Sequence, residues 1–556
     1  MKDEFKSLSL AVILSFIAIY SVNIFFGVNK NTDELTKIQQ IEEELNKVTD
    51  LATNNEPILK EEIQEPIEEK RLNIDNGVVK GSIRLNGSRF DNLLLEKYSK
   101  TLDNKDEKVE LLAQNKTENP YFAEFGWLSL DKNVKLPNSK SLWNTTSKDI
   151  TTSNPAVLTW KNDAGLKFIR KVTIDDNYLF TITDTVENLS GEEVELFPYA
   201  LISRDVANFE QNRSVVHEGM SAVIDGTLKE FKYSDLKGGE SETFETEGGW
   251  VGFSDRYWFS ALITPDKEKN KITMKNNANS NYQVDYLGKR FVIPNGEASS
   301  YTYKFYAGAK EIKLLDKYTK HNGIPKFDLA VDFGWYYFLT KPFFYILDFL
   351  YGFLGNMGWA ILLFAAILRL IMFPIANKSF ANMAKMKALQ PKLDEIKEKY
   401  GNNQMLIQQA TMELYKKEKI NPASGCLPML IQIPVFFSLY KVLNIAIEIR
   451  HAPFIGWIKD LSAPDPLTLS KISHLPLPSF MDIGLWPILM GLTMWFQQKL
   501  NPAPVNKDQA MMFTLMPVIF TFMLGHFASG LVIYWTLSNL LSIIQQKVIM
   551  SKNGVK

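Results

Sequence analysis

The sequence predicts a mixed architecture, a six-span α-helical membrane protein with a large antiparallel β-sandwich domain outside the membrane. Three observations predict it. Residues 8–28 form an apolar run long enough to cross a bilayer. Residues 72–325 are polar and alternate in the manner of strands. Residues 356–550 contain five further apolar runs. Lys and Arg number 62 against 63 Asp and Glu, so net charge indicates no class of partner.

The first apolar run, LSLAVILSFIAIYSVNIFFGV, predicts a transmembrane anchor over residues 1–30. A cleaved signal peptide is the alternative, but its apolar part is usually shorter and a small-residue cleavage site follows it. VNIFFGVNKN has no such pattern, which favours an uncleaved anchor. Residues 31–71 follow with twelve Asp/Glu against five Lys/Arg, a composition too polar to bury a core. We expect this segment to be a solvated linker.

The segment LKFIRKVTIDDNYLFTITDTVEN shows the β pattern of residues 72–325 best. Two alternating stretches flank a turn at 175–177, which predicts a β-hairpin. Turn residues recur at short spacing, so we expect an antiparallel sandwich of sheets. The side chains expected on one face of the two strands are Phe168, Arg170, Val172, Phe180, Ile182, Asp184 and Val186.

Residues 333–355, FGWYYFLTKPFFYILDFLYGFLG, are rich in aromatic side chains. Lys341, Pro342 and Asp348 interrupt the apolar character. Aromatic rings favour the boundary between lipid and water, so we expect a helix that lies in the membrane interface rather than one that crosses it.

The bias of Lys and Arg between loops predicts the orientation of the spans. The loop 376–425 has nine Lys and five Asp/Glu, a net of +4, whereas loop 448–482 has a net of −1. Positive loops stay in the cytoplasm, so both termini are expected inside and residues of about 30–355 outside, in a periplasm. The predicted regions are TM2 at 356–376, a cytoplasmic helical hairpin at 377–425, and TM3–TM6 within 426–550, with apolar runs at 426–447, 483–499, 511–528 and 530–549.

Two helices are expected around YGNN in the cytoplasmic loop, over residues 378–420. They are either an antiparallel pair that buries its own apolar stripe, or a basic, Met-bearing surface that receives hydrophobic segments or ribosomal RNA. The apolar positions at helical spacing are Met383, Met386, Leu389, Leu406, Ala410 and Leu414.

Arg369 lies inside WAILLFAAILRLIMFP, a run that is otherwise uncharged. A charge in the middle of a membrane costs about 2.5–3.5 kcal/mol on insertion scales, so such residues usually face a wet cavity or partners on other helices. Ala365 and Ala366, one turn earlier, leave space beside Arg369 but offer it no acceptor. The alternative is an arginine that reaches to the inner interface, since Pro374 and Lys378 follow closely. We favour the cavity.

Neutral polar side chains punctuate the later apolar runs. They indicate either ordinary hydrogen bonds between helices, worth about 0.6 kcal/mol each, or a shared wet groove with Arg369. Lys441 near the outer end of its run is expected to extend outward. Tyr534 and Trp535 have the position of interface anchors. The neutral polar positions are Gln432, Thr493, Gln497, Thr536, Ser538, Asn539 and Gln545.

Several classes of function lack support in the sequence. Cys426 is the only cysteine, so disulfides within the chain and Cys-rich zinc sites are excluded. There is no GxxxxGK[ST] phosphate loop. We therefore expect no enzyme, cofactor or metal. A carbohydrate enzyme remains a rival hypothesis for the β domain, but His217 and His321 sit in no recognisable motif.

Several motifs resemble the YidC family of membrane protein insertases, in the Gram-negative form with a large periplasmic domain. In the membrane part they are LRLIMFPIANKSFANMAKMKALQPKLDEIKEKYG, NPASGCLPMLIQIPVFFSLYKVL, DLSAPDPL, MPVIFTFM and SGLVIYWTLSNLLSIIQQ. DDNYLFTITDTVEN and GGWVGFSDRYWFSALI are similar to the periplasmic domain of that form. The resemblance covers most of the chain except the linker.

The resemblance implies a five-helix core with a hydrophilic groove, a supersandwich-like periplasmic domain, and location in the cell inner membrane. It implies a groove arginine at Arg369, a groove glutamine at Gln432, and an aromatic pair at Tyr534 and Trp535 that meets substrates. The implied partners are nascent membrane proteins, the Sec translocon and the ribosome, with a chaperone role and no small-molecule substrate. Some members carry threonine at the position of Ala365, so that residue's role does not carry over. A small-solute anion transporter is the alternative, but no internal repeat supports it.

Overall fold

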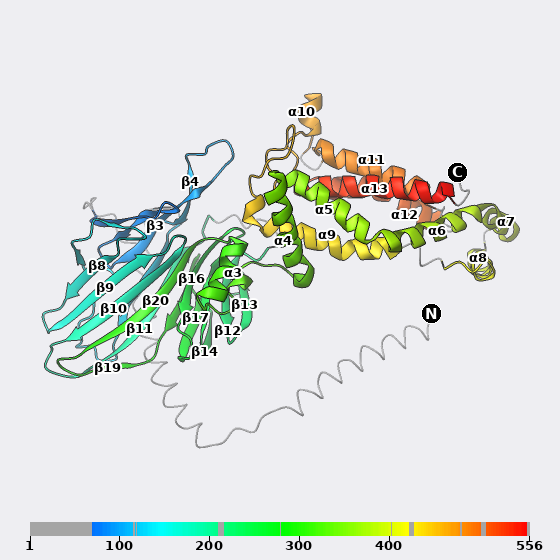
Figure 1. The fold of residues 1–556 in the computed structure, drawn as a ribbon. Helices are drawn as coiled ribbons and strands as arrows, with labels where there is room; N and C mark the ends of the chain where they lie inside the picture. The colour runs from blue at the N-terminus through cyan, green and yellow to red at the C-terminus, as the bar shows by residue number, and fades with distance from the viewer. Residues whose placement is uncertain are drawn as a thin grey trace, which may run out of the picture.

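The computed structural model describes residues 69–552 except 115–116, 118, 209–215, 279, 402, 422–426, 479–480 and 502–506. The predicted anchor at 1–30 and residues 31–68 of the predicted linker lie outside the described residues. A β-rich domain and an elongated bundle of helices lie end to end (Figure 1). The prediction of a large antiparallel β-rich domain followed by a helical region is confirmed.

The β domain consists of two sheets, antiparallel except where β1 pairs with β7. The first sheet has eleven strands, with β19 pairing β11 and β4 pairing β3 off the main path. Its strands in spatial order are β14 (Ser241–Thr246), β17 (Asn270–Ala278), β18 (Asn281–Leu287), β11 (Val194–Asp205), β5 (Tyr121–Leu128), β3 (Arg89–Ser99), β2 (Val79–Arg84), β1 (Arg71–Asp75) and β7 (Asp149–Ile150), with β19 (Phe291–Ile293) and β4 (Lys108–Leu112) at the side.

The second sheet has nine strands, with β13 at one edge and β6 at the other. Its strands in spatial order are β13 (Thr227–Lys232), β12 (Gly219–Ile224), β15 (Gly249–Ser254), β16 (Trp258–Thr264), β20 (Ala298–Ala309), β10 (Leu179–Asn188), β9 (Leu166–Ile174), β8 (Ala156–Lys161) and β6 (Asn144–Thr145).

The predicted hairpin is β9–β10, and its alternation is confirmed because every second residue is buried. Arg170 and Asp184 face each other inside the sandwich. Arg170 donates from Nε and Nη2 to the two Asp184 oxygens at 2.7 Å each, and from Nη2 to the Phe125 carbonyl at 2.7 Å. The Trp143 ring covers the guanidinium. A buried charge is tolerated when it is paired and hydrogen-bonded in this way.

After the β domain the chain is mainly helical. Its helices are α3 (Ile312–His321), η1 (Phe327–Ala330), α4 (Tyr337–Leu354), α5 (Met357–Ile371), α6 (Phe373–Ala388), α7 (Gln390–Tyr400), α8 (Gln404–Lys417), α9 (Leu427–Ile445), η3 (Ile447–Ile449), α10 (Leu469–Ser473), α11 (Leu485–Leu500), α12 (Lys507–Leu524) and α13 (Ser529–Lys552). The pair α7 and α8 and the C-terminal end of α13 lie at the end of the bundle opposite the β domain (Figure 1).

Helix α4 runs across the direction of α9, α11 and α13 (Figure 1). Its charged residues explain this placement, because they face the β-domain side rather than lipid. Lys341 pairs with Asp316 at 2.8 Å and with Asp328 at 2.7 Å, and Asp348 pairs with Lys313. The helix ends at Gly355, whose φ of 67° is left-handed and favours glycine.

The predicted continuous run over 356–376 is interrupted in the structure. Helix α5 ends at Ile371, and α6 begins at Phe373 with a bend of 67° between them. Pro374 supplies the reason, because proline lacks an N–H and is best accommodated in the first turn of a new helix. The predicted run over 356–376 therefore corresponds to α5 and the first residues of α6.

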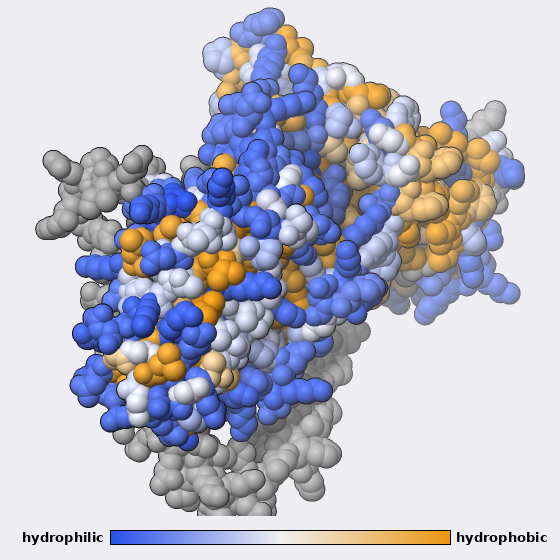
Figure 2. All heavy atoms as spheres, turned by 60° about the vertical axis from the view of Figure 1, so that its left-hand side comes forward, coloured by the Kyte–Doolittle hydropathy of each residue, from blue (hydrophilic) through white to orange (hydrophobic). Residues whose placement is uncertain are grey.

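Apolar exposure separates the two parts of the molecule. Among the described residues, large apolar side chains are exposed at five positions in the β domain and at forty positions after Phe333. Figure 2 shows the contrast between the largely hydrophilic β domain and the apolar surface of the helical region. No single described helix is long and apolar enough to cross a membrane alone, although the bent pair α5–α6 meets that criterion together.

Polar contacts attach the β domain to the outer ends of the helices. Arg256 donates from Nε to the Asn444 carbonyl at 2.8 Å. Arg450 donates from Nη2 to the carbonyls of Ser99 at 2.8 Å and Lys100 at 3.0 Å. Because both arginines cross between the parts, the β domain is docked on α9 and the loop after it rather than tethered beside them.

Glu448 places a carboxyl group in this contact. Its Oε1 accepts a hydrogen bond from the Ile312 backbone N–H at 3.2 Å. Its Oε2 is buried with no partner among the described residues. Burial, with the carboxylates of Glu311 and Asp348 nearby, raises the pKa of Glu448 to about 7. In the folded chain the Glu448 carboxyl therefore stays protonated to a higher pH than it does in the unfolded chain.

This pKa predicts a pH-dependent stability. From about pH 4.5 to 7 the native state binds more protons than the unfolded state, so the free energy of unfolding falls as pH rises, by up to about 3 kcal/mol. Glu448→Gln is expected to remove this slope and to raise the unfolding temperature at pH 8 but not at pH 5. Thermal unfolding of the full chain in detergent, followed by circular dichroism, measures it. Glu193→Gln, an exposed carboxylate, is the control; an unchanged slope in Glu448→Gln would contradict the assignment.

Candidate functional site

Helix α13 is the centre of the candidate site, because α5, α6, α9 and α11 all pack against it. Its first residue, Ser529, is fixed by hydrogen bonds from its hydroxyl to the carbonyls of Ala463 at 2.8 Å and Asp460 at 3.0 Å. A row of polar side chains at spacings of three or four residues follows along one side of the helix. We call Tyr534, Ser538, Ser542 and Gln545 the polar seam.

Arg369 reaches from the last turn of α5 to the polar seam. It donates from Nη2 to the Ser538 carbonyl at 2.7 Å, to the Ser538 hydroxyl at 3.3 Å, and to the Ser542 hydroxyl. Its Nε is buried without a hydrogen-bond partner among the described residues. No carboxylate pairs with Arg369 in the described part of the chain. The guanidinium is therefore held by neutral acceptors and keeps its positive charge uncompensated.

Gln432 and Tyr534 extend this network. Gln432 on α9 donates from Nε2 to the Tyr534 hydroxyl at 2.9 Å. Tyr534 lies one helical turn before Ser538, which accepts from Arg369. The structure thus brings three of the four predicted site residues to one place, and α13 connects them.

Trp535 has different surroundings. Its ring makes edge contact with Phe436 at 4.6 Å between centroids and lies 6.0 Å from the ring of Phe520. Trp535 therefore packs toward α9 and α12, whereas Tyr534 is buried against Gln432. Both aromatic residues thus contact α9, Tyr534 through Gln432 and Trp535 through Phe436.

Other predicted polar positions pair between helices. Asn539 donates from Nδ2 to the Thr493 hydroxyl on α11 at 3.1 Å. Gln545 donates from Nε2 to Asn377 Oδ1 on α6 at 2.8 Å. Thr536 donates only to the Val532 carbonyl of its own helix, at 2.8 Å. The seam thus continues from Arg369 to Asn377 on α6, while Asn539 faces α11.

Ser542 is the residue that the sequence analysis does not single out. It follows Ser538 by four residues and Tyr534 by eight, a spacing that places all three on one face of a helix. Its hydroxyl accepts from Arg369 and donates to the Ser538 carbonyl at 2.7 Å. Helical spacing from Ser538 is the signal that could have found it. The hydroxyl groups beside Arg369 therefore come from Ser538 and Ser542 on α13. Ala365, one turn before Arg369 on α5, provides none.

Residues 377–417 span most of α6 and all of α7 and α8, and the apolar positions of these helices are either buried between helices or exposed. Met383 is buried where α6 meets α13, with Ile549 packed against its cluster. Leu389 and Leu393 pack with Tyr415, which joins α7 to α8. The exposed apolar side chains of α8 are Met405, Leu406 and Met412.

The remaining predicted positions lie apart from the seam. Lys441 pairs with Asp332 at 2.5 Å rather than extending into solvent. The His217 ring contacts the Met220 carbonyl at 3.1 Å, and the His321 ring contacts the Lys317 carbonyl at 3.3 Å. His217 precedes β12 and also donates its backbone N–H to Asp332 Oδ2 at 3.2 Å, whereas His321 lies at the end of α3. Gln497 is half-buried on α11.

Two family models match the chain. The model for the YidC periplasmic domain matches residues 71–346. The model described as the 60Kd inner membrane protein matches residues 349–555. The boundary between the two matches lies within α4, the helix that joins the β domain to the bundle.

Curated relatives align over the full chain. The membrane protein insertase YidC of Rickettsia canadensis (strain McKiel) is 43% identical over 561 residues, which cover 100% of both chains. That of Rickettsia massiliae (strain Mtu5) is 44% identical over the same length and coverage. A solved structure titled as an active YidC insertase with the first transmembrane domain resolved is 18% identical, covers 90% of this chain and 98% of its own, and has a TM-score of 0.37.

Proposed function

This chain belongs to the YidC family of membrane protein insertases, and from that premise we propose that it inserts membrane proteins along the polar seam of α13, with Arg369 as the residue that meets the passing segment. Insertase function itself follows from the full-length relatives and both family models. One observation carries the proposal for the mechanism. Arg369 is a half-buried cation held only by neutral oxygens, in a helix that is otherwise apolar.

A client enters from the cytoplasmic end in this mechanism. The exposed Met405, Leu406 and Met412 of α8 offer it an apolar surface, and methionine adapts to segments of different shape. The short polar or acidic outer portion of the client then moves along the seam, where Arg369 attracts it. Hydrogen bonds to a charged group are worth about 1.5–3 kcal/mol, enough for transient holding.

The seam lowers the cost of crossing for polar groups. Polar atoms of Arg369, Gln545 and Gln546 are buried without partners among the described residues, which supports water beside the seam. Helices α5 and α11 have 15 and 16 residues. At 1.5 Å per residue they are several ångströms shorter than the ~30 Å hydrocarbon core, which supports a locally thinned bilayer.

The client's apolar helix then leaves the seam sideways into lipid. Its burial there contributes about 0.8 kcal/mol per CH₂ group and drives the step. The exposed apolar faces of α9 and α12 supply the path, as their side chains already suit contact with hydrocarbon. A membrane potential assists acidic outer tails by acting on their charge.

The topology within this proposal has six spans, with both termini in the cytoplasm and the β domain in the periplasm. The separation in Figure 1 supports it, because the basic helices α7 and α8 lie at the end of the bundle opposite the β domain. The proposed partners are the Sec translocon and the ribosome. The protein acts either alone or beside the translocon, and the ribosome binds the basic hairpin formed by α7 and α8. A chaperone role for folding clients belongs to the same proposal.

The test is insertion of a single-span client into proteoliposomes that contain the purified chain. Protease protection of the client's outer tail measures the insertion, and empty liposomes are the control. The same vesicles are assayed for uptake of small anions. Insertion without solute flux is the expected result. Solute flux that needs no client, together with failed insertion, would favour a transporter and contradict the seam mechanism.

A further inference from the structure

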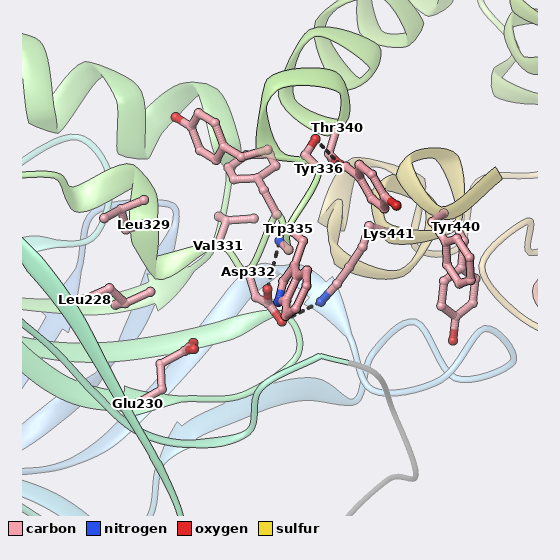
Figure 3. A pocket seen from close by; sticks show the side chains of 14 residues that line it. Leu228, Glu230, Leu329, Val331, Asp332, Trp335, Tyr336, Thr340, Tyr440 and Lys441 are labelled. Atoms are coloured by element: carbon pink, nitrogen blue, oxygen red, sulfur yellow. Dashed lines mark hydrogen bonds and ion pairs between the residues drawn. The ribbon is translucent and has the colours of Figure 1, made fainter. Parts of the chain in front are cut away.

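A cavity of about 630 Å³ lies where the β domain, α4 and α9 meet, away from the polar seam. Strand β13 contributes Leu228 and Glu230, the segment before α4 contributes residues 329–337, and α9 contributes Phe437, Tyr440 and Lys441. Figure 3 shows Trp335, Asp332 and Lys441 close together at its centre, with Glu230 on the β-domain side. Nothing in the insertase mechanism above uses this cavity.

The walls of the cavity combine aromatic rings with charges of both signs. Trp335 is 99% exposed, although a tryptophan of a folded domain is normally covered. Asp332 pairs with Lys441 at 2.5 Å, and Gly334 lies against the Lys441 stem with a left-handed φ of 71°. The stem and backbone therefore hold the ammonium group of Lys441 in place at the cavity wall.

Glu230 gives the cavity a surplus negative charge. No donor or cation pairs with its carboxylate among the residues that the structure describes, whereas the charges of Asp332 and Lys441 offset each other. Glu230 lies exposed on β13. Desolvation and the neighbouring Asp332 raise the pKa of Glu230, against the opposing charges of Lys310 and Lys441, and a further cation beside the carboxylate would stabilise its charged form. A ligand that brings an ammonium group to Glu230 and a phosphate to Lys441 complements these charges.

An apolar track leads from the cavity along α9. Phe437 lines the cavity, and Ile433 and Leu430 follow on the same helical face; all three side chains are exposed. They continue away from the end of α9 that is docked on the β domain at Asn444. A ligand with a polar head in the cavity would thus lay an acyl chain along this face.

We propose that this cavity binds the headgroup of a zwitterionic aminophospholipid of the outer leaflet, with its primary ammonium at Glu230 and Trp335, its phosphate at Lys441, and an acyl chain along Phe437, Ile433 and Leu430. A ring face attracts a cation, and tryptophan is the strongest of the aromatic residues in this role. Anionic lipids are disfavoured by the net charge of the wall. The inference rests on the membrane topology of the proposed function, but not on the role of Arg369.

The experiment is native mass spectrometry of the full chain released from nanodiscs with equal amounts of phosphatidylethanolamine, phosphatidylcholine and phosphatidylglycerol. Wild type is expected to retain one phosphatidylethanolamine at least fivefold more often than either other lipid. Glu230→Gln and Trp335→Ala are expected to abolish this preference. The matched controls are Glu242→Gln on β14, an exposed carboxylate of another edge strand, and Phe338→Ala, an exposed aromatic of α4; both should retain it.

Equal retention of the three lipids by wild type, or a preference that survives in both cavity variants, would overturn the proposal. A lipid preference that persists when a basic peptide is added would support the site. Displacement of all lipid by that peptide at micromolar concentration would identify a polypeptide occupant and overturn the proposal. Client insertion by each variant is measured in parallel. Failed insertion with intact lipid preference counts against the seam mechanism alone, and intact insertion without lipid preference counts against the lipid site alone.

Discussion

Replacing Arg369 by alanine is expected to reduce insertion of a client with a short acidic outer tail by 10-fold or more, on the order of the 1.5–3 kcal/mol that a hydrogen bond to a charged group contributes. A client with a neutral tail should lose much less, because it has no charge for the guanidinium to attract. Arg369→Lys is expected to retain much of the activity if positive charge is what the seam requires. The measurement is co-translational insertion into proteoliposomes at matched protein abundance.

Lys378→Ala is the matched control for this experiment, since it removes an exposed cation at the start of α6 that lies outside the hydrogen bonds of the seam. Its insertion activity should stay near that of wild type for both clients. Equal loss for acidic and neutral tails in Arg369→Ala would show that the arginine only fastens α5 to α13. Equal loss in the alanine and lysine variants would mean that the forked contacts with Ser538 and Ser542 matter more than charge.

Removing one partner of the buried pair in the β domain is expected to have the largest effect on stability. Asp184→Ala leaves the Arg170 guanidinium buried with the Phe125 carbonyl as its remaining acceptor. Breaking a buried pair in this way typically costs about 3–5 kcal/mol. For a domain of this size we expect the unfolding temperature to fall by roughly 10 °C. Thermal unfolding of the full chain in detergent, read from the β signal in circular dichroism, measures the change.

The double variant Arg170→Met with Asp184→Leu provides the comparison, because replacing both charges by apolar side chains is often neutral. Its unfolding temperature should lie much closer to that of wild type. Thr183→Ala on the same strand, whose hydroxyl pairs with Thr302 at the exposed face, should change little. If the double variant were as unstable as Asp184→Ala, shape rather than charge at this position would determine the stability.

Local patterns in the sequence predicted the β domain and the position of its core. Alternation over residues 166–188 placed Arg170 and Asp184 on the same strand faces as Phe168 and Ile182, and the structure shows that this face is buried and that the two charges pair there. The period of two in a strand is a property of neighbouring residues, so it can be read without knowing the fold. The pairing register, with Arg170 opposite Asp184, came only from the structure.

The membrane part was predicted less completely. Apolar runs marked five of the helices, because lipid and core demand the same composition over many residues. The break between α5 and α6 was not predicted, because Pro374 begins a new helix instead of ending a longer one. Lys341 and Asp348 favour an interfacial α4 in the sequence, and only the structure shows that their partners lie on α3 and η1.

By itself, the sequence determined that a cation sits among apolar residues at Arg369 and that its partner has to come from elsewhere. Only the tertiary structure decided which helix provides that partner, since Ser538 and Ser542 lie more than 160 residues along the chain. The cavity between Glu230 and Lys441 could not be predicted from the sequence either, because its walls come from three segments that are far apart in the chain. Periodicity fixes which face of a helix is buried, but which faces meet depends on packing between elements far apart in the chain.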